Sequence, residues 1–552
     1  MLLWKRVRAE MIQTRSRVKR LTSTWSSRAR AAVLLPMFAL VLAGLACTRA
    51  DVPPPGGIGS GSLPDPTEEA TLQPEATQDV DSPRPTLPAT RIPPSPTSTP
   101  DRPEPVASPT FPATPTTSAS EVSEIIVYES QPGDNRRALA VRFGVLPEEI
   151  TSPDLLPEEK AMIDPGQVLL IPSRFSETGP DVKLIPDSEL VFSPNAAEFD
   201  VIAFADSEGG YLNRYREIVN GFWRTGPEIV ERVALNNSIN PRILLAVLEF
   251  QSGWLTRTTV PEGDAFMFPL DFIDNQHMGL YRQLTWLANE LGNGYYGWRD
   301  GSLTDVHFQS STTQRLAPDL NAGTAALQYY FAINRNQLTW ERVLNDEGFI
   351  ATYHSLFGDP WAYEYPLFEP GVEQPPLILP FIPGHVWSFT GGPHGAWERD
   401  SAWAALDFAP ASSVTGCTVS EDWVVAAAPG LVVRSDNGTV VIDLDGDGRE
   451  QTGWSLLYLH VYKDDRVEQG TFVVAGDRLG HPSCEGGIAT GTHIHIARKY
   501  NGEWILADGS LPFNLDGWIA RAGSKAYQGA LVKEGKEVLA CTCASAETLI
   551  QR

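Results

Sequence analysis

Residues 491–497 read Gly-Thr-His-Ile-His-Ile-Ala, and this short run decides how the chain is interpreted. Alternating polar and apolar residues are typical of a β-strand, in which successive side chains point to opposite faces. His493 and His495 therefore share one face, and Ile494 and Ile496 share the other. Two imidazoles on one face provide a metal ligand with a neighbouring base. Such pairs also arise by chance, so residues elsewhere must support the interpretation.

Further candidate residues precede this strand. His460 closes an apolar run, Leu-Leu-Tyr-Leu, at 456–459. Glycines at 486, 487 and 491 lead into the histidine pair and allow a substrate backbone to approach closely. Earlier in the chain, Gly-Gly-Pro-His ends at His394, and Ala-Leu-Asp-Phe follows with Asp407.

In this order the motifs resemble the lysostaphin-type zinc metallopeptidases. The common pattern in that family has a histidine four residues before the aspartate, where this chain has Trp403. The beta-lytic, or staphylolytic, branch uses Gly-Gly-Pro-His instead, which His394 matches. The resemblance implies a Zn²⁺ site made by His394, Asp407 and His495.

The same resemblance implies that His460 and His493 are catalytic. They would take the proton from the attacking water, or bind the developing oxyanion and protonate the leaving amine. It further implies a preference for glycine-containing peptides and a disulfide between Cys417 and Cys484. Two imidazoles and one carboxylate are typical of catalytic zinc, because structural sites are usually closed and rich in thiolate. The alternative is a β fold that binds without metal.

Residues 376–552 form the predicted peptidase domain with a C-terminal extension. Apolar and alternating runs separated by Gly and Asp predict an antiparallel all-β fold. Cys541 and Cys543 are too close together for an unstrained bridge to be assumed. The run Asp443–Gly448 resembles the start of a calcium loop, but Trp454 replaces the expected glutamate, and a hairpin turn explains the composition equally well.

The N-terminus indicates export. Nine basic residues and one acidic residue precede the apolar run 31–46, which predicts a signal peptide over 1–46. Gly44–Cys47 resembles a lipobox, so we expect either a lipid anchor at Cys47 or simple secretion to the cell envelope. Residues 51–120 contain 18 prolines, and 47–122 is therefore predicted to be a disordered Pro/Ser/Thr-rich linker.

Residues 124–174 resemble a LysM module. The match rests on Gln-Pro-Gly-Asp at 131–134, Arg-Phe-Gly-Val at 142–145 and Pro-Gly-Gln at 165–167. The resemblance implies a small βααβ fold that binds the glycan of peptidoglycan. The alternative is the same fold with its glycan groove lost.

Residues 198–372 are predicted to be an all-α domain. Asn240-Pro241 is a typical helix start, and apolar residues follow at helical spacing. Residues 281–291 and 322–333 are predicted to be further amphipathic helices. The segment 240–254 resembles the first catalytic helix of lysozyme-like lytic transglycosylases. Gln251 stands where that family has its acidic residue, and an amide cannot protonate a leaving group. Glu249 lies about 200° away on the helix. We therefore expect this domain to be non-catalytic.

Composition narrows the functional classes. With 43 basic and 68 acidic residues the net charge is −25, which argues against a nucleic-acid partner. The sequence predicts a multidomain α+β protein that hydrolyses peptide bonds of peptidoglycan stem peptides or cross-bridges, held at the wall by LysM. The alternatives are a non-catalytic peptidoglycan-binding scaffold, or activator of another hydrolase, and a transglycosylase with another acid in 198–372.

Overall fold

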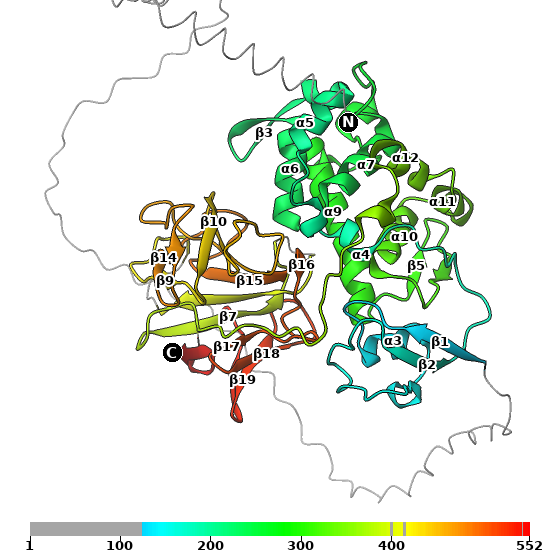
Figure 1. Cartoon of the computed structure of the whole chain (residues 1–552). Helices are drawn as coiled ribbons and strands as arrows, with labels where there is room; N and C mark the ends of the chain where they lie inside the picture. The colour runs from blue at the N-terminus through cyan, green and yellow to red at the C-terminus, as the bar shows by residue number, and fades with distance from the viewer. Residues whose placement is uncertain (1–123, 398–400, 412–415, 544) are drawn as a thin grey trace, which may run out of the picture. The chain divides into compact units, whose positions relative to one another are not determined.

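The computed structural model describes residues 124–397, 401–411, 416–543 and 545–552 (Figure 1). The predicted signal peptide, Cys47 and the linker lie outside these residues. Within the described part, helices and antiparallel strands occur together, and the segment from Val386 onward contains strands and one short 3₁₀ helix. The predicted mixture of helix and sheet, with an antiparallel all-β C-terminal region, is confirmed. No helix among the described residues has the length and apolar character that a membrane crossing requires.

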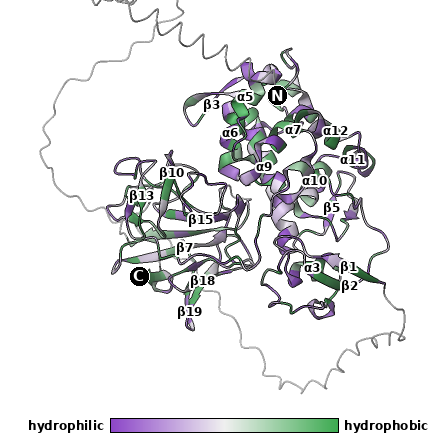
Figure 2. Cartoon of the chain, viewed as in Figure 1, coloured by the Kyte–Doolittle hydropathy of each residue, from purple (hydrophilic) through white to green (hydrophobic). Residues whose placement is uncertain are grey.

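The first structured segment is a two-stranded sheet with one helix. β1 (Ile125–Glu129) pairs antiparallel with β2 (Val168–Pro172), and α3 (Arg136–Phe143) packs on them. Both strands are mainly hydrophobic (Figure 2). The second helix of the predicted βααβ pattern is absent; the described chain has only the 3₁₀ turn η1 (Pro147–Glu149) between α3 and β2. Prolines at 147, 153 and 157 lack the N–H that a continuous helix needs.

The next segment consists of helices around one buried core. Helices begin before residue 198, and both hydrophobic and hydrophilic residues occur along α6 and α9 (Figure 2). The prediction of an all-α segment is wrong, because two short hairpins are present. Asn220-Gly221 connects the strands of the first hairpin, and this pair is a strong hairpin signal. The elements are α4 (Asp187–Leu190), η2 (Pro194–Ala196), α5 (Val201–Glu208), η3 (Tyr211–Arg214), β3 (Arg216–Val219), β4 (Phe222–Thr225), α6 (Gly226–Asn237), α7 (Pro241–Ser252), α8 (Asp264–Met267), η4 (Asn275–His277), α9 (Leu280–Asp300), β5 (Asp305–His307), β6 (Thr313–Arg315), α10 (Ala322–Ile333), α11 (Gln337–Leu344), α12 (Phe349–Phe357) and η5 (Pro360–Tyr363).

The C-terminal segment is built on a large antiparallel sheet. Its strand order is β13-β10-β11-β12-β15-β8-β7-β21, with β16 paired to β15. A second sheet has the order β17-β18-β19-β20, and β9 pairs with β14. The strands are β7 (Val386–His394), β8 (Ala405–Pro410), β9 (Val424–Val425), β10 (Gly430–Asp436), β11 (Thr439–Asp443), β12 (Trp454–Leu459), β13 (Phe472–Val473), β14 (Arg478–Gly480), β15 (Ile494–Tyr500), β16 (Glu503–Trp504), β17 (Asn514–Leu515), β18 (Trp518–Ala522), β19 (Gly529–Lys533), β20 (Lys536–Leu539) and β21 (Leu549–Gln551); η6 (Ala546–Thr548) precedes the last.

Strand register sets the positions of the candidate residues. His495 lies opposite Asp407 across β15 and β8, and Leu459 lies opposite His495 across β12 and β15. Between β7 and β8, Asp407 lies opposite Gly391, and irregularities in β7 separate Gly391 from His394. Such bulges redirect a side chain at the end of a strand. Four neighbouring strands therefore present their polar side chains at one end of the sheet.

Helix α9 is fixed to the C-terminal sheet by buried polar contacts. The guanidinium of Arg299 lies 3.1 Å from carboxylate oxygens of both Asp187 and Glu503. The hydroxyl of Tyr295 donates to Glu503 over 2.7 Å, and the indole N–H of Trp504 donates to the carbonyl of Asn237 over 3.1 Å. A buried charge without its partner is strongly destabilising, so this junction holds α9 in one position relative to β15 and β16.

Candidate metal centre

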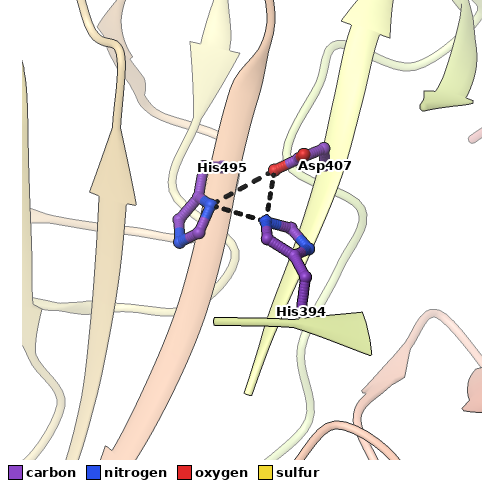
Figure 3. Close-up of side chains that lie close together, drawn as sticks. All are labelled: His394, Asp407 and His495. Atoms are coloured by element: carbon purple, nitrogen blue, oxygen red, sulfur yellow. Dashed lines mark hydrogen bonds and ion pairs between the residues drawn. The ribbon is translucent and has the colours of Figure 1, made fainter. Parts of the chain in front are cut away.

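Three of the predicted site residues converge on one point. His394 ends β7, Asp407 lies in β8 and His495 lies in β15, and all three side chains are buried. Asp407 Oδ1 is 3.2 Å from His394 Nε2 and 3.2 Å from His495 Nδ1, and these two nitrogens are 3.0 Å apart (Figure 3). The three side chains are grouped closely enough to surround one metal ion.

The outer nitrogens of both imidazoles are occupied by backbone carbonyls. His394 Nδ1 lies 2.8 Å from the carbonyl of Gly392, and His495 Nε2 lies 2.9 Å from that of Ala396. A carbonyl accepts only, so each of these nitrogens carries the proton in the neutral ring. The nitrogens that face each other and Asp407 are then unprotonated. Metal-binding histidines commonly have their tautomer fixed in this way.

The donor set fits a cation. Asp407 Oδ1 is buried and has no hydrogen-bond donor. Three acceptor atoms in close contact are stable only with a proton or a metal ion among them. Two imidazoles and a carboxylate are a ligand set that suits zinc.

The glycine before this site leaves room for the carboxylate. A Cβ on Gly391 would lie 2.5 Å from Asp407 Oδ2, which is closer than van der Waals contact allows. A larger residue at position 391 of the Gly-Gly-Pro-His motif would therefore collide with the Asp407 carboxylate. Trp403 stands where the common pattern of the family has its histidine, and it is not one of the three clustered residues. Its carbonyl accepts a hydrogen bond from the amide of Ala507 over 2.9 Å.

The second pair of histidines lies beside the first cluster. The ring centroids of His460 and His493 are 4.4 Å apart, and His493 Nε2 is 3.9 Å from Asp407 Oδ1. His460 Nδ1 donates to the carbonyl of Glu485 and His493 Nδ1 to that of Gly491, which leaves Nε2 of each ring as a proton acceptor. Burial, with repulsion from His493 and His495, lowers the pKa of His460 to about 3. His460 is therefore neutral near pH 7.

His460 also adopts an uncommon backbone conformation. Its φ is +68°, in the left-handed region that non-glycine residues seldom occupy. Strain of this kind costs about 1–3 kcal/mol and persists only where surrounding contacts impose it. Here the carbonyl of His460 accepts from both the amide and the hydroxyl of Ser483. These contacts fix the imidazole next to His493.

All five residues line one pocket of about 1270 Å³. Its walls include the glycine-rich run 486–491 and Trp397. The helical segment contributes two residues that the sequence did not indicate, Asn220 and Tyr281. Asn220 belongs to a turn signal, Asn220-Gly221, but neither residue belongs to a motif that indicates a catalytic site, so only the folded structure brings them to the pocket.

Tyr527 is a further residue that sequence reasoning missed. Its ring stacks on that of His394, with centroids 4.1 Å apart, and it lines the same pocket. The amide of Gly392 donates to the Tyr527 carbonyl over 2.9 Å, and Tyr527 has a φ of +68°. The loop around it has no periodic pattern. Its strained backbone, visible only in the structure, is the signal that distinguishes it.

The cysteines lie near this pocket, whereas the acidic turn 443–448 lies at the other end of β11 and β12. Cys417 and Cys484 are bridged, as expected, and Gly416 and Thr418 next to Cys417 line the pocket. Cys541 and Cys543, for which no bridge was assumed, are also bonded. The carboxylate of Asp443 accepts backbone N–H groups of Asp445, Gly446 and Gly448, the pattern of a tight turn.

The predicted lysozyme-like helix is α7. The side-chain oxygen of Gln251 accepts from Arg335 over 3.1 Å. Glu249 accepts backbone N–H groups of Leu255 and Thr256, so it stabilises the loop after the helix. Both side chains thus have structural partners. The absence of catalysis by this segment remains a prediction.

Comparisons with known proteins relate the chain to a protease. A family model described as LasA, N-terminal domain, matches residues 183–370. Protease LasA of Pseudomonas aeruginosa is 27% identical over 333 residues, which cover 55% of this chain and 73% of LasA. The chain is therefore related over this range to a protease, which agrees at a coarse level with the peptidase activity that its motifs led us to expect.

Two solved structures are similar to part of the chain. The M23 metalloprotease pseudoalterin from the deep sea is 22% identical, with a TM-score of 0.25, and the match covers 30% of this chain and 94% of pseudoalterin. The catalytic domain of lysostaphin from Staphylococcus simulans is 21% identical, with a TM-score of 0.17, and covers 22% and 89% respectively.

Proposed function

We propose that this chain is a zinc-dependent endopeptidase that hydrolyses peptide bonds of peptidoglycan, in stem peptides or cross-bridges. One observation carries the proposal. His394 Nε2, His495 Nδ1 and Asp407 Oδ1 face one another as unprotonated acceptors beside a large pocket that also holds a second histidine pair. A structural zinc site would instead be closed, and typically built from thiolates.

The chain's own residues fit the requirements of amide hydrolysis. His394, Asp407 and His495 would hold Zn²⁺, which polarises a peptide carbonyl and makes the attacking water more acidic. Nε2 of His460 or His493 accepts the proton of that water, and the pair returns a proton to the leaving amine. Carbonyls of Glu485 and Gly491 fix the orientation of both rings at the pocket, so Nε2 of each ring is held ready to accept a proton.

We further propose that the chain acts in the cell envelope. The signal-like N-terminus would direct export, after which the protein would be either anchored by a lipid at Cys47 or secreted. Residues 124–174 would hold it on the glycan. Attachment to the polymer raises the local concentration of peptide at the pocket. The relationship to protease LasA supports the peptidase activity, and the choice of peptidoglycan as substrate follows from the resemblance of the motifs.

Zinc content and product analysis test the proposal. The full mature chain is compared with His394→Ala and Trp403→Ala after zinc is supplied. About one zinc per chain, lost in His394→Ala and kept in Trp403→Ala, is expected, and digestion of peptidoglycan is expected to release new amino termini. A folded chain that takes up no zinc and releases nothing would be a wall-binding scaffold, and anhydro-sugars among the products would identify a transglycosylase.

A further inference from the structure

A small disulfide ring lies at the edge of the pocket that holds the histidines, which we refer to as the metal pocket. Cys541 and Cys543 are bonded to each other, and Thr542 between them lines the metal pocket. His394 and His493 line the same pocket. A bridge between cysteines two positions apart removes little entropy from the unfolded chain, so its main effect is on its own surroundings.

The chain just before the bridge is fixed to the sheet. The amide of Ala540 donates to the carbonyl of Gly529 over 2.9 Å. The amide of Cys541 donates to the carbonyl of Phe389 in β7 over 3.2 Å. Because β7 ends at His394, Cys541 is attached to a strand that forms part of the site. Neither hydrogen bond involves a sulfur atom, so neither depends on the bridge.

Thr542 itself is held in a different way. It is exposed, and it makes no hydrogen bond to any residue that the structure describes. The next anchored residue after the bridge is Ser545, whose carbonyl accepts both the amide and the hydroxyl of Thr548. Among the described contacts, the covalent ring is therefore what fixes Thr542 at the edge of the pocket.

The same edge offers a polar group without a partner. Thr390 follows Phe389 in β7 and lines the metal pocket, and its hydroxyl oxygen is buried with no hydrogen-bond partner among the described residues. A bound molecule that supplies the missing partner gains affinity, because a buried hydroxyl left alone is costly. Cys541 is bonded to Phe389, so Thr390 and Thr542 belong to one part of the pocket. This part is suited to bind a polar group of a substrate.

The two sulfur atoms of the bridge are not equivalent. Cys543 is exposed and Cys541 is half-buried, so an attacking thiolate reaches Sγ of Cys543 more easily. The amide of Cys543 donates to Sγ of Cys541 over 3.0 Å. A backbone N–H stabilises negative charge on the atom that it contacts, which makes Cys541 the better leaving group in thiol–disulfide exchange.

We propose that the Cys541–Cys543 bridge is a redox site that controls substrate binding at the metal pocket, with a dithiol as its reductant. This inference rests on the proposed function. A thiolate of the dithiol attacks Sγ of Cys543, the S–S bond breaks, and Cys541 leaves as a thiolate. The second thiol of the reductant then displaces Cys543. The reductant ends as a disulfide, and the two cysteines receive its two electrons and two protons. Thr542 is then released from the edge of the pocket.

The bridge between Cys417 and Cys484 provides a comparison within the same molecule. Its cysteines are 67 positions apart, so opening it removes a large constraint from the unfolded chain and destabilises the fold. Opening the Cys541–Cys543 ring lacks this cost. Exposed bridges of small structural value are the ones that reductants open first. A dithiol therefore acts on Cys541 and Cys543 while the longer bridge stays closed.

The test uses the full mature chain with zinc supplied and dithiothreitol as the dithiol. Labelling of free thiols, followed by mass spectrometry, shows which cysteines are reduced at each concentration. KM and kcat for a peptidoglycan peptide are measured in the same samples. Cys541→Ser/Cys543→Ser represents the open state, and a thermal melt verifies its fold. Ser545→Ala is the matched control, because it lies in the same loop and does not line the pocket.

We expect the thiols of Cys541 and Cys543 to appear at about ten-fold less dithiothreitol than those of Cys417 and Cys484. At that point KM should rise about five-fold with kcat unchanged, because substrate binding is altered and the histidines are not. The double serine variant should show the raised KM without reductant and no further change with it. Ser545→Ala should respond to the reductant as the wild type does.

Three results would overturn the proposal. One is a wild-type KM in the double serine variant. Another is a fall in kcat with KM unchanged when the ring opens. The third is an equal loss of activity in the wild type and in the double serine variant on addition of dithiothreitol, which would mean that the reagent acts by withdrawing zinc.

The redox site and the peptidase function fail separately. If the wild type cleaves no peptide, the peptidase function is wrong, and the methyl NMR signal of Thr542 decides the redox site. Its absence from Thr542→Ser assigns the signal. Selective reduction should shift and narrow it, and the double serine variant should give the same shifted signal. A signal that reduction leaves unchanged would show that the ring does not hold Thr542.

Discussion

His394 Nε2 and His495 Nδ1 lie 3.0 Å apart, and neither can donate to the other while their opposite nitrogens donate to carbonyls. The arrangement is poised for a cation. We predict that zinc stabilises the full chain against heat, by about 4 kcal/mol when free zinc exceeds Kd a thousand-fold. Calorimetry with and without zinc measures this. His394→Ala should abolish the zinc-dependent shift, and an equal shift in that variant would show that zinc binds elsewhere.

The second histidine pair should affect catalysis more than metal binding. His493→Gln removes a proton acceptor, and we expect kcat to fall by about 10²- to 10⁴-fold while zinc content stays the same. His481→Gln is the control, because His481 bonds to the carbonyl of Asp422 and does not line the pocket. Loss of zinc from His493→Gln would instead make His493 a ligand.

Gly391→Ala should disturb the site through one added methyl group. The new Cβ would meet Asp407 Oδ2 at 2.5 Å, so the carboxylate must move away from the two imidazoles. We expect a loss of about 1–3 kcal/mol in unfolding free energy together with weaker zinc binding. Gly292→Ala in α9 serves as the control, because a Cβ there would make only an ordinary van der Waals contact, 4.0 Å from Tyr296 Cδ2. Unaltered zinc affinity in Gly391→Ala would mean that the carboxylate is not needed.

The two disulfides should differ greatly in their effect on stability. The Cys417–Cys484 bridge closes a loop with a sequence separation of 67, for which chain entropy predicts about 4 kcal/mol. Cys541 and Cys543 are separated by only two positions, so little chain entropy is removed. Denaturant unfolding of the two double serine variants measures the difference. Equal losses would contradict the loop-entropy explanation.

The ion pairs of Glu450 predict an acid-dependent loss of stability. Burial would raise the pKa of Glu450, but Arg434 and Lys499 outweigh it and lower the pKa below its ordinary value. A lowered folded-state pKa stabilises above the unfolded value of about 4.3, and this stabilisation is lost as pH falls through the folded value.

Glu450→Gln should therefore be less stable than the wild type near pH 7, with a gap that narrows below about pH 4.3 as the wild-type carboxylate becomes protonated. Urea unfolding of both proteins from pH 7 to pH 3 measures the gap. A constant gap across this range would show that the amide fails for a reason other than charge. Glu534→Gln, on an exposed turn, is the control.

Strand periodicity explains how much of the site the sequence could predict. The alternation at 493–496 placed two imidazoles on one face, and the buried isoleucines of β15 agree with it. The position of a residue along its own strand does not show which strand lies next to it. The meeting of His394, Asp407 and His495 could therefore be predicted only from the resemblance to a known family. Tyr527, Asn220 and Tyr281 come from irregular or distant segments, and no local pattern indicates them.

The helices of the segment 198–372 were only partly predictable from the sequence. Ala322–Ile333 forms a helix with the predicted bounds, but ten of its twelve residues are buried, so it lies inside the core and does not have the predicted amphipathic pattern. The helix predicted over 281–291 extends to Asp300, where Gly301 ends it in the left-handed conformation. Asn220-Gly221 is a strong turn signal, but an all-α interpretation of 198–372 leaves no place for the β3–β4 hairpin that it connects.

The buried junction around Arg299 has a practical consequence for anyone who wishes to prepare the C-terminal sheet alone. A fragment cut near residue 376 would bring Trp504 and Ile505, now buried, into water and would leave Glu503 without Arg299 and Tyr295. Such a fragment would be prone to precipitate during purification. Replacing Trp504 and Ile505 with hydrophilic side chains would be the first remedy to try.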